Sequence, residues 1–517
     1  MYKERRNKLA ERMRQKNQTG LILLPGNVLM PRNYQDNTYC FRQDSNFLYF
    51  FGIALPDCTG VIDIETGAGF LFYDLPDESL QIWIGVPSYE AIEQSGLQAV
   101  YPKSKLASYI ADKPVHFLPQ YNGFALLELS QLLCEKPELL GKRVSLALIQ
   151  SVIAMRQCKE LGEISEIERA VNTTISMHKE AIRLARPGTS ERDIMAGITA
   201  IALQDGDISF QPIVTVHGEI LHNHAYDKIL QSGQLLLVDA GAETCTGYAG
   251  DLTTTLPVNG VYSPEQREIY EIVLKAGSEA AALLKPGFKF KDAHVTACRV
   301  IAEGLSAIGI LKGSSDDIVA EGAHALFFPH GLGHMMGLDV HDMEGLGEDY
   351  VGYDREPRST QFGLRSLRLA KALQANMVVT IEPGIYFIPL LIAAWKKENR
   401  HANFINYNKL EAWLSFGGIR NEEDWLITET GARRLGAQFD KSSQAIESLY
   451  KEELENNKEK KKEKDIEKLY KENLQSLEKE FLRIKSIISD LNFGSTIMES
   501  DYRAIFASMS DLVVFQS

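Results

Sequence analysis

Four acidic side chains lie at the ends of apolar segments, where a carboxylate can do chemistry. Asp239 closes the apolar run LLLV, and Asp251 opens DLTTTLPV after a Gly-rich stretch. Glu382 follows MVVTI and precedes ProGly, and Glu422 follows GGIRN. Two carboxylates at facing strand positions repel each other unless a cation lies between them. Taken singly, each fragment is more typical of an ordinary turn Asp or strand-end Glu than of a metal site.

Histidine is concentrated in one part of the chain, since eight of the eleven histidines fall between residues 217 and 341. The segment HGLGHMMGLDVHD places His330 and His334 four positions apart, with His341 seven further on. A neutral imidazole is the commonest nitrogen ligand of a catalytic metal, and a neighbouring histidine can orient it or shuttle protons. A lone histidine is more often a core residue, but this cluster indicates a metal or acid–base site.

The last acidic motif leaves its ligand open. In GGIRNEED, period-two alternation puts Arg420 and Glu422 on one side of an extended segment. Glu423 and Asp424 are rival ligands at that point.

The combination of these fragments predicts an oxygen-rich metal site with a single nitrogen ligand. Hard oxygen donors favour Mn²⁺, and Zn²⁺, Co²⁺ or Fe²⁺ also suit the set. Four carboxylates leave a site of two divalent ions nearly neutral. Two such ions, about 3.5–4 Å apart, can share and acidify a water and polarise a carbonyl.

The elements that position these residues fall into three predicted domains. Residues 1–155 alternate short apolar strands with helical stretches, which predicts a small α/β domain. Residues 156–440 contain two long helices that end at ProGly (187–188 and 286–287), each followed by β-rich sequence, which indicates an α+β domain with an internal duplication. Residues 441–517 form a Lys/Glu-rich helical C-terminal extension, with a stripe typical of an amphipathic helix or short coiled coil, made by Leu474, Leu477, Phe481, Ile484, Ile488 and Leu491.

Composition excludes several classes of partner. The net charge of −14 disfavours nucleic acid and anionic membrane surfaces, because phosphate binding needs clustered Lys and Arg. No run approaches the roughly 18 apolar residues of a membrane helix, and the charged N-terminus has no apolar core of a signal peptide. Six cysteines without a CxxC pair suit reduced thiols. We therefore expect a cytoplasmic protein that binds neither nucleic acid nor membranes.

The order Asp, Asp, His, Glu, Glu, in the frames VDAGAETCTGYAGD, HGLGHMMGLDVHD, TIEPGIY and GGIRNEED, resembles the pita-bread metallopeptidases. Among them it looks most like the Xaa-Pro aminopeptidase (aminopeptidase P) family, over roughly residues 1–440. FRQDSNFLYFFG, at residues 41–52, looks like the arginine-containing motif of the creatinase-type N-terminal domain. The resemblance implies an α+β fold, in which a pita-bread catalytic domain follows a smaller α/β domain. The charged helical extension lies outside the resemblance.

The resemblance implies a role for each matching residue. Asp239 and Asp251 are expected to be carboxylate ligands of two divalent metal ions, with Asp251 and Glu422 bridging them. His334 is expected to bind one ion, and Glu382 to be both a ligand and the general base.

Four further residues are expected to act around these ligands. His222 and His341 resemble the histidines that contact substrate and stabilise or protonate the reacting amide. His330 and Arg420 look like residues that support the ligands or orient the substrate.

Two departures from the family pattern concern this site. Asp239 and Asp251 are twelve positions apart, one more than the family spacing, which predicts an extra residue or a bulge in the hairpin. Asn421 occupies a position that is usually aliphatic. Neither change removes a ligand.

The implied function is a metallo-aminopeptidase that hydrolyses the bond between an N-terminal residue and a following proline, by a hydroxide bridging the metals. An Xaa-Pro dipeptidase (prolidase) is the alternative that uses the same metals. A non-catalytic peptide- or protein-binding member of the fold is the alternative of another class, although all five ligand positions are filled. We expect peptides with proline second as substrates, and a homodimer or higher homo-oligomer.

Overall fold

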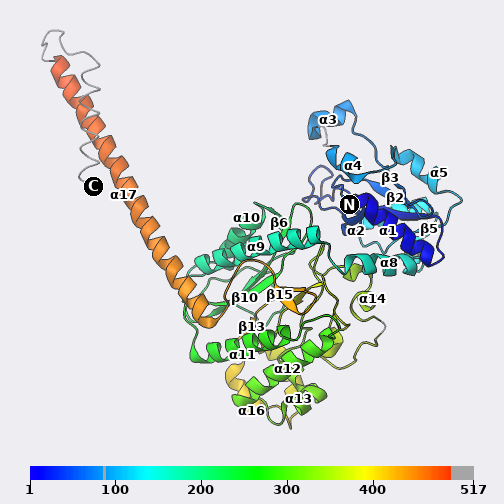
Figure 1. Cartoon of the computed structure of the whole chain (residues 1–517). Helices are drawn as coiled ribbons and strands as arrows, with labels where there is room; N and C mark the ends of the chain where they lie inside the picture. The colour runs from blue at the N-terminus through cyan, green and yellow to red at the C-terminus, as the bar shows by residue number, and fades with distance from the viewer. Residues whose placement is uncertain (86–88, 355, 491–517) are drawn as a thin grey trace. The chain divides into compact units, whose positions relative to one another are not determined.

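The structure is a computed structural model that describes residues 1–85, 89–354 and 356–490. It contains two compact units, Met1–Glu447 and a second unit that begins at Ser448. The first unit combines helices with small sheets whose strands are mostly antiparallel (Figure 1), which agrees with the expected α+β class. All six cysteines are free. Among the described residues, no helix has both the length and the apolar character that a membrane crossing requires.

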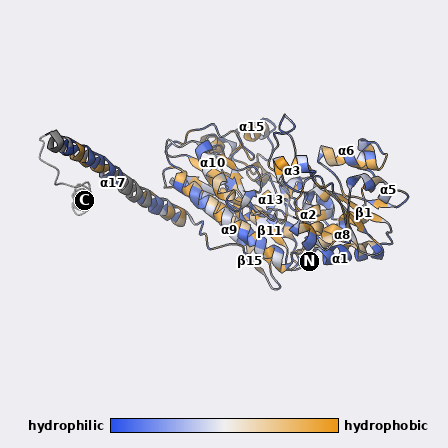
Figure 2. Ribbon diagram, turned by 90° about the horizontal axis from the view of Figure 1, so that it is seen from above, coloured by the Kyte–Doolittle hydropathy of each residue, from blue (hydrophilic) through white to orange (hydrophobic). Residues whose placement is uncertain are grey.

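The N-terminal part of the chain is built on a mixed five-stranded sheet in the order β4-β3-β2-β1-β5. The β1–β2 and β2–β3 pairs are antiparallel, and the β3–β4 and β1–β5 pairs are parallel. β1 is buried along its whole length, which explains its unbroken apolar sequence LILLP (orange in Figure 2). The strands are β1 (Leu21–Pro25), β2 (Thr59–Asp63), β3 (Gly69–Phe72), β4 (Ala99–Tyr101) and β5 (Val115–His116).

Helices precede, connect and follow the strands of this sheet along the chain. The start of one of them, α2, is fixed by a side-chain cap. The side chain of Asp44 accepts a hydrogen bond from the Phe47 amide and so caps α2, which ends at Gly52 in the left-handed conformation. The helices are α1 (Tyr2–Gln15), α2 (Ser45–Phe51), α3 (Glu78–Ile84), α4 (Glu90–Ser95), α5 (Leu106–Ile110), α6 (Gly123–Leu132), α7 (Pro137–Leu140) and α8 (Leu146–Arg156).

Two helix pairs frame the strands that follow, as the sequence predicted. Each pair turns at a ProGly, where Gly188 and Gly287 have φ values of 93° and 83°. Asp193 and Asp292 then lie in the first turn of the second helix of each pair. In Figure 1 the first pair lies on one side of the strands and the second pair on the other. The pairs are α9 (Leu161–Leu184) with α10 (Glu191–Ala202), and α11 (Pro264–Ala281) with α12 (Phe290–Ala307).

The strands between these helices form small antiparallel sheets, in the orders β10-β8-β7, β11-β14-β15, β12-β13 and β6-β9. An isolated bridge joins Thr253 of β10 to Glu422, which lies between β13 and β14, and another joins Met335 in a loop to Val379 of β11. The first half supplies β6 (Gly206–Ile208), β7 (Ile213–Thr215), β8 (Leu235–Ala240), β9 (Ala242–Thr244) and β10 (Leu252–Pro257). The second half supplies β11 (Val378–Ile381), β12 (Gly384–Tyr386), β13 (Gly418–Arg420), β14 (Glu423–Ile427) and β15 (Ala432–Arg434). Short helices α13 (Ser315–Glu321), α14 (Glu348–Gly352), α15 (Pro389–Lys397) and α16 (Tyr407–Leu410) lie in the second half.

The predicted C-terminal helix is present as α17 (Ser443–Asp490). Of its predicted apolar stripe, Leu474, Leu477 and Phe481 are partly exposed. Leu491 and the side chains of Ile484 and Ile488 lie outside the described part of the chain.

Candidate metal centre

Asp239 and Asp251 come from two neighbouring buried strands, β8 and β10. The residue opposite Asp239 is Thr253, and Asp251 lies one position before β10 begins. The two aspartates are therefore diagonal neighbours rather than a directly facing pair.

The hairpin that joins these strands has no bulge between residues 239–243 on one strand and 249–253 on the other. Asp239 pairs with Thr253, and further along Glu243 pairs with Ala249, so the same number of residues separates the two pairs on each strand. The bulge predicted from the spacing is therefore wrong for this stretch. The chain reverses at Cys245–Gly247, where Gly247 has a φ of 90° and donates its amide to the Thr244 carbonyl.

His334 and Glu382 are held together because the His334 segment runs alongside β11. The His334 amide donates to Thr380 Oγ1 at 3.1 Å, and the Thr380 amide donates back to the His334 carbonyl at 3.0 Å. The Glu382 amide donates to the Leu332 carbonyl at 2.8 Å. A Cβ at Gly333 would lie 2.1 Å from the Thr380 carbonyl oxygen, so this approach requires glycine.

Glu422, rather than its two acidic neighbours, faces the cavity. Its Oε2 accepts a hydrogen bond from Thr253 Oγ1 at 2.7 Å. Glu423 instead makes ion pairs with Arg434 and Lys441, both at 3.4 Å. Asp424 accepts from the Asp251 amide at 3.0 Å and does not line the cavity. Alternation along the strand thus turns Glu423 away from the cavity, and the contact with the Asp251 amide occupies Asp424.

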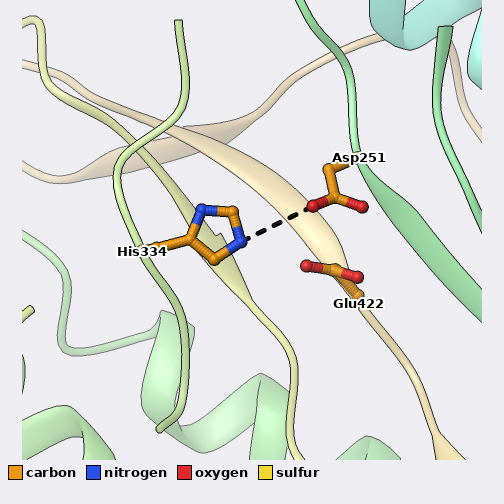
Figure 3. A group of neighbouring side chains, drawn as sticks. All are labelled: Asp251, His334 and Glu422. Atoms are coloured by element: carbon orange, nitrogen blue, oxygen red, sulfur yellow. Dashed lines mark ion pairs between the residues drawn. The ribbon is translucent and has the colours of Figure 1, made fainter. Parts of the chain in front are cut away.

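The structure brings all nine predicted site residues to one cavity of about 370 Å³. Its centre holds Asp251, His334 and Glu422, which offer ligand atoms within 4.8 Å of one another (Figure 3). His334 Nε2 lies 3.5 Å from Asp251 Oδ2 and 3.8 Å from Glu382 Oε1. The nine residues are His222, Asp239, Asp251, His330, His334, His341, Glu382, Arg420 and Glu422.

Burial and mutual repulsion make the ionised carboxylates costly in this cavity. Burial raises the pKa of Glu422 well above its usual value, and the charges of Asp251 and Glu382 add to the shift. Burial, followed by the charges of Asp239 and Asp424, raises the pKa of Asp251. Burial also raises the pKa of Glu382. Such a set is stable in the ionised form only when cations balance it.

Protein cations supply little of that balance. Among the described residues that line the cavity, Arg368 and Arg420 carry the permanent positive charges. Arg420 pairs with Asp239, and Arg368 pairs with Glu344. Asp251 Oδ1 is buried and has no hydrogen-bond partner. An orphaned carboxylate oxygen beside two more carboxylates and an imidazole fits a divalent metal ion.

The histidines are oriented by contacts on their other ring nitrogen. His334 Nδ1 lies 3.1 Å from its neighbour's carbonyl, the Met335 oxygen, which leaves Nε2 facing the carboxylates, as in a metal ligand. The ring of His341 stacks on that of His334, with centroids 3.9 Å apart. Burial lowers the pKa of His341 to about 4 and that of His330 to about 3, so both imidazoles are neutral at pH 7.

Three contributors were missed from the sequence. Tyr386 accepts from Arg420 Nη1 at 2.9 Å and lies 2.8 Å from His330 Nε2. Thr253 donates to the Glu422 carboxylate, and Asp424 accepts from the Asp251 amide. All three lie within quoted motifs, Tyr386 in TIEPGIY, Thr253 in DLTTTLPV and Asp424 in GGIRNEED, but the sequence offered Asp424 only as a rival ligand and gave the other two no role.

The comparisons with known proteins agree with this geometry. Residues 165–429 match metallopeptidase family M24, and residues 2–114 match the aminopeptidase P N-terminal domain. The chain belongs to metallopeptidase family M24.

Named relatives of this M24 chain carry two activities. A probable Xaa-Pro aminopeptidase of Fusarium vanettenii is 32% identical over 425 residues, covering 81% of this chain and 90% of that protein. The human Xaa-Pro dipeptidase is 32% identical over 448 residues, covering 83% and 89%. Aminopeptidase P from Escherichia coli with the inhibitor Pro-Leu superposes with a TM-score of 0.71 at 29% identity, covering 88% of this chain and 98% of that one. The predicted pita-bread fold is thereby confirmed.

Metal removal should expose the repulsion in the cavity. Carboxyl groups whose pKa is raised by folding bind protons more tightly in the folded state, so the free energy of unfolding of the metal-free protein should fall as pH rises from about 5 to about 8. Asp251→Asn removes one repelling charge and should raise the Tm of the EDTA-treated protein at pH 8 by several degrees. Scanning calorimetry with and without Mn²⁺ measures both effects. The exposed Asp36→Asn is the control, and an unchanged or lower Tm for Asp251→Asn would contradict the interpretation.

Proposed function

We propose that this M24 chain is a metal-dependent Xaa-Pro aminopeptidase, which removes the N-terminal residue from peptides with proline in second position. The observation that carries the proposal is the convergence of four carboxylates and His334 in one cavity that lacks matching protein cations. The names of the relatives support the preference for an Xaa-Pro bond.

The five central residues are proposed as the ligands of two divalent ions, Mn²⁺ in preference to Zn²⁺, Co²⁺ or Fe²⁺. Asp239, Asp251, His334, Glu382 and Glu422 would hold these ions through four carboxylates and one imidazole. When bound, two such ions supply a nucleophilic water at neutral pH and polarise the amide carbonyl.

The chain's own groups then handle the proton and the substrate. Glu382 accepts the proton of the attacking water, because its carboxylate lines the cavity with Oε1 3.8 Å from His334 Nε2. His341 and His222, at the wall of the cavity, stabilise or protonate the reacting amide. Tyr386 keeps its proton, since burial raises its pKa to about 12, and it holds His330 and Arg420 in place.

Loss of Glu382 tests this assignment. We expect Glu382→Gln to lower kcat/KM for an Xaa-Pro-Yaa peptide by at least about 10³-fold at saturating Mn²⁺, because it removes both a ligand and the general base. The exposed Glu429→Gln should keep wild-type activity. Near-normal turnover by Glu382→Gln would show that the catalytic group is elsewhere.

A second candidate is an Xaa-Pro dipeptidase, and Arg368 favours it. This side chain lines the cavity and is 38% exposed. Its Nη1 donates to Glu344 Oε2 at 2.6 Å and to Glu348 Oε1 at 3.2 Å, whereas no hydrogen bond of Nε or Nη2 is seen among the described residues. A dipeptide ends in a carboxylate, which a guanidinium binds in bidentate fashion, whereas a longer peptide has a neutral amide at that point.

Substrate length separates the two candidates. The aminopeptidase proposal predicts that Xaa-Pro-Yaa is cleaved at least as well as Xaa-Pro, and that Arg368→Met changes its kcat/KM by less than about threefold. The dipeptidase alternative predicts cleavage confined to Xaa-Pro, and a loss of about 10- to 100-fold in Arg368→Met through a rise in KM. Matched Ala-Pro and Ala-Pro-Ala kinetics on both proteins decide between them.

We further propose a homodimer or higher homo-oligomer and a cytoplasmic location. The exposed apolar side chains of α3, Ile82, Trp83 and Ile84, support self-association, because monomers rarely expose such a patch. Sedimentation of the wild type and Trp83→Ser tests the assembly, and a monomeric wild type would refute it. Cell fractionation tests the location.

A protein that binds peptide without cleaving it under any metal condition would instead support the non-catalytic alternative.

A further inference from the structure

The loop that carries His341 has no regular secondary structure of its own. Residues 337–343 lie between helices and strands, and Met343 has a left-handed φ of 64°. The stacking of His341 on His334 nevertheless requires this loop to keep one position. The Ala249 amide of the hairpin donates to the Gly337 carbonyl at 2.8 Å, and side chains of residues 42–45 and 156–159 make further contacts with the loop.

The first contact is a buried ion cluster on Asp342, next to His341. Asp342 is 1% exposed and accepts Arg156 Nη2 and Lys159 Nζ, both at 2.6 Å. Arg156 also donates to Asn46 Oδ1 at 2.6 Å. Removing one partner of such a cluster would leave an uncompensated buried charge, so the loop is fixed as long as the cluster is complete.

The second contact is a single guanidinium between two segments of the metal centre. Arg42 Nη2 donates to the Leu338 carbonyl on the His341 loop, and also to the Gly247 carbonyl at 3.1 Å. Arg42 Nε lies 3.0 Å from both carboxylate oxygens of Glu243. Glu243 and Gly247 belong to the hairpin that joins Asp239 to Asp251.

Ser45, three residues after Arg42, strengthens the same junction. Its hydroxyl donates to Asp339 Oδ1 at 2.6 Å. Ser45 opens α2, whose start is fixed by the Asp44 cap. Arg42 and Ser45, at the beginning of α2, thus both contact the His341 loop, and Arg42 also contacts the hairpin.

We propose that Arg42 and Arg156 are positioning residues of the catalytic site. Arg42 holds the His341 loop against the hairpin that carries Asp239 and Asp251, and Arg156 holds the same loop through Asp342. Neither touches the reacting atoms. The expected effect of these residues on turnover rests on the proposed function. Their effect on the position of the loop does not depend on it.

Arg42 allows a matched comparison. Arg433 forms a similar two-pronged pair with Glu168, at 2.8 and 2.9 Å, on the surface and away from the cavity. Arg42→Met should lower kcat for an Xaa-Pro substrate about tenfold and leave KM within about twofold, because a misplaced His341 affects the transition state more than substrate binding. Arg42→Lys should recover part of kcat, since one ammonium reaches some of the same acceptors. Arg433→Met should leave both constants unchanged. Metal content of each protein is measured so that lost occupancy is not mistaken for lost positioning.

Backbone hydrogen exchange measures how firmly the loop is held and does not depend on enzyme activity. Backbone amides in residues 335–345 and 243–250 should exchange faster in Arg42→Met than in the wild type, and no faster in Arg433→Met. Asp342→Asn, which keeps the shape but removes the charge, should speed exchange in residues 335–345 alone.

The outcomes are separable. Unchanged exchange in Arg42→Met overturns the proposal, because the guanidinium then does not hold the loop. Faster exchange with unchanged kcat also overturns it, because the position of the loop then does not matter for turnover. If the wild type cleaves no Xaa-Pro substrate, the proposed function fails, and the exchange data alone still judge the contact.

Discussion

Repulsion among four carboxylates in one cavity is the constraint to which much of this fold responds. Two unit charges 4 Å apart in a protein interior repel by about 4 kcal/mol at an effective dielectric constant of 20. Asp239, Asp251, Glu382 and Glu422 are carried on separate elements, so each carboxylate depends on the backbone around it to stay in place. Without cations the raised pKa values of three of these groups show the cost of that arrangement.

The strand framework resists this repulsion through shared hydrogen bonds rather than through local propensity. Thr253 pairs with Asp239 in the β8–β10 register, donates to Glu422 and accepts from Arg420 Nε at 3.2 Å. One threonine therefore links three of the groups that face the cavity. Asp424, behind the cavity, fixes the Asp251 amide in the same way. Because these contacts join both halves of the domain, neither half could form the site alone.

The sequence predicted which residues line the cavity better than it predicted the contacts that hold them. Each of the five residues proposed as ligands lies close to an apolar run or a glycine, so short motifs along the chain were enough to find it. The bulge was wrong because pairing register depends on both strands of the hairpin, and spacing along one chain does not reveal it. Thr253 and Asp424 act on residues 169 and 173 positions away. No periodicity in the sequence reports such a distance, and an ordinary threonine in a β-branched strand gives no other signal.

The arginine motif at residues 41–52 also shows that the sequence does not reveal long-range contacts. Arg42 was visible as part of a family-like motif, but its partners in the hairpin and in the His341 loop are 201 to 296 residues away. Within the His341 loop the contacts continue outward: His341 lies 3.1 Å from Glu344, and Glu344 accepts from Arg368. One line of contacts therefore runs from the N-terminal part of the chain, through His341, to Arg368 at the wall of the cavity. Because these groups share partners, the effects of substituting them together should differ from the sum of the single effects.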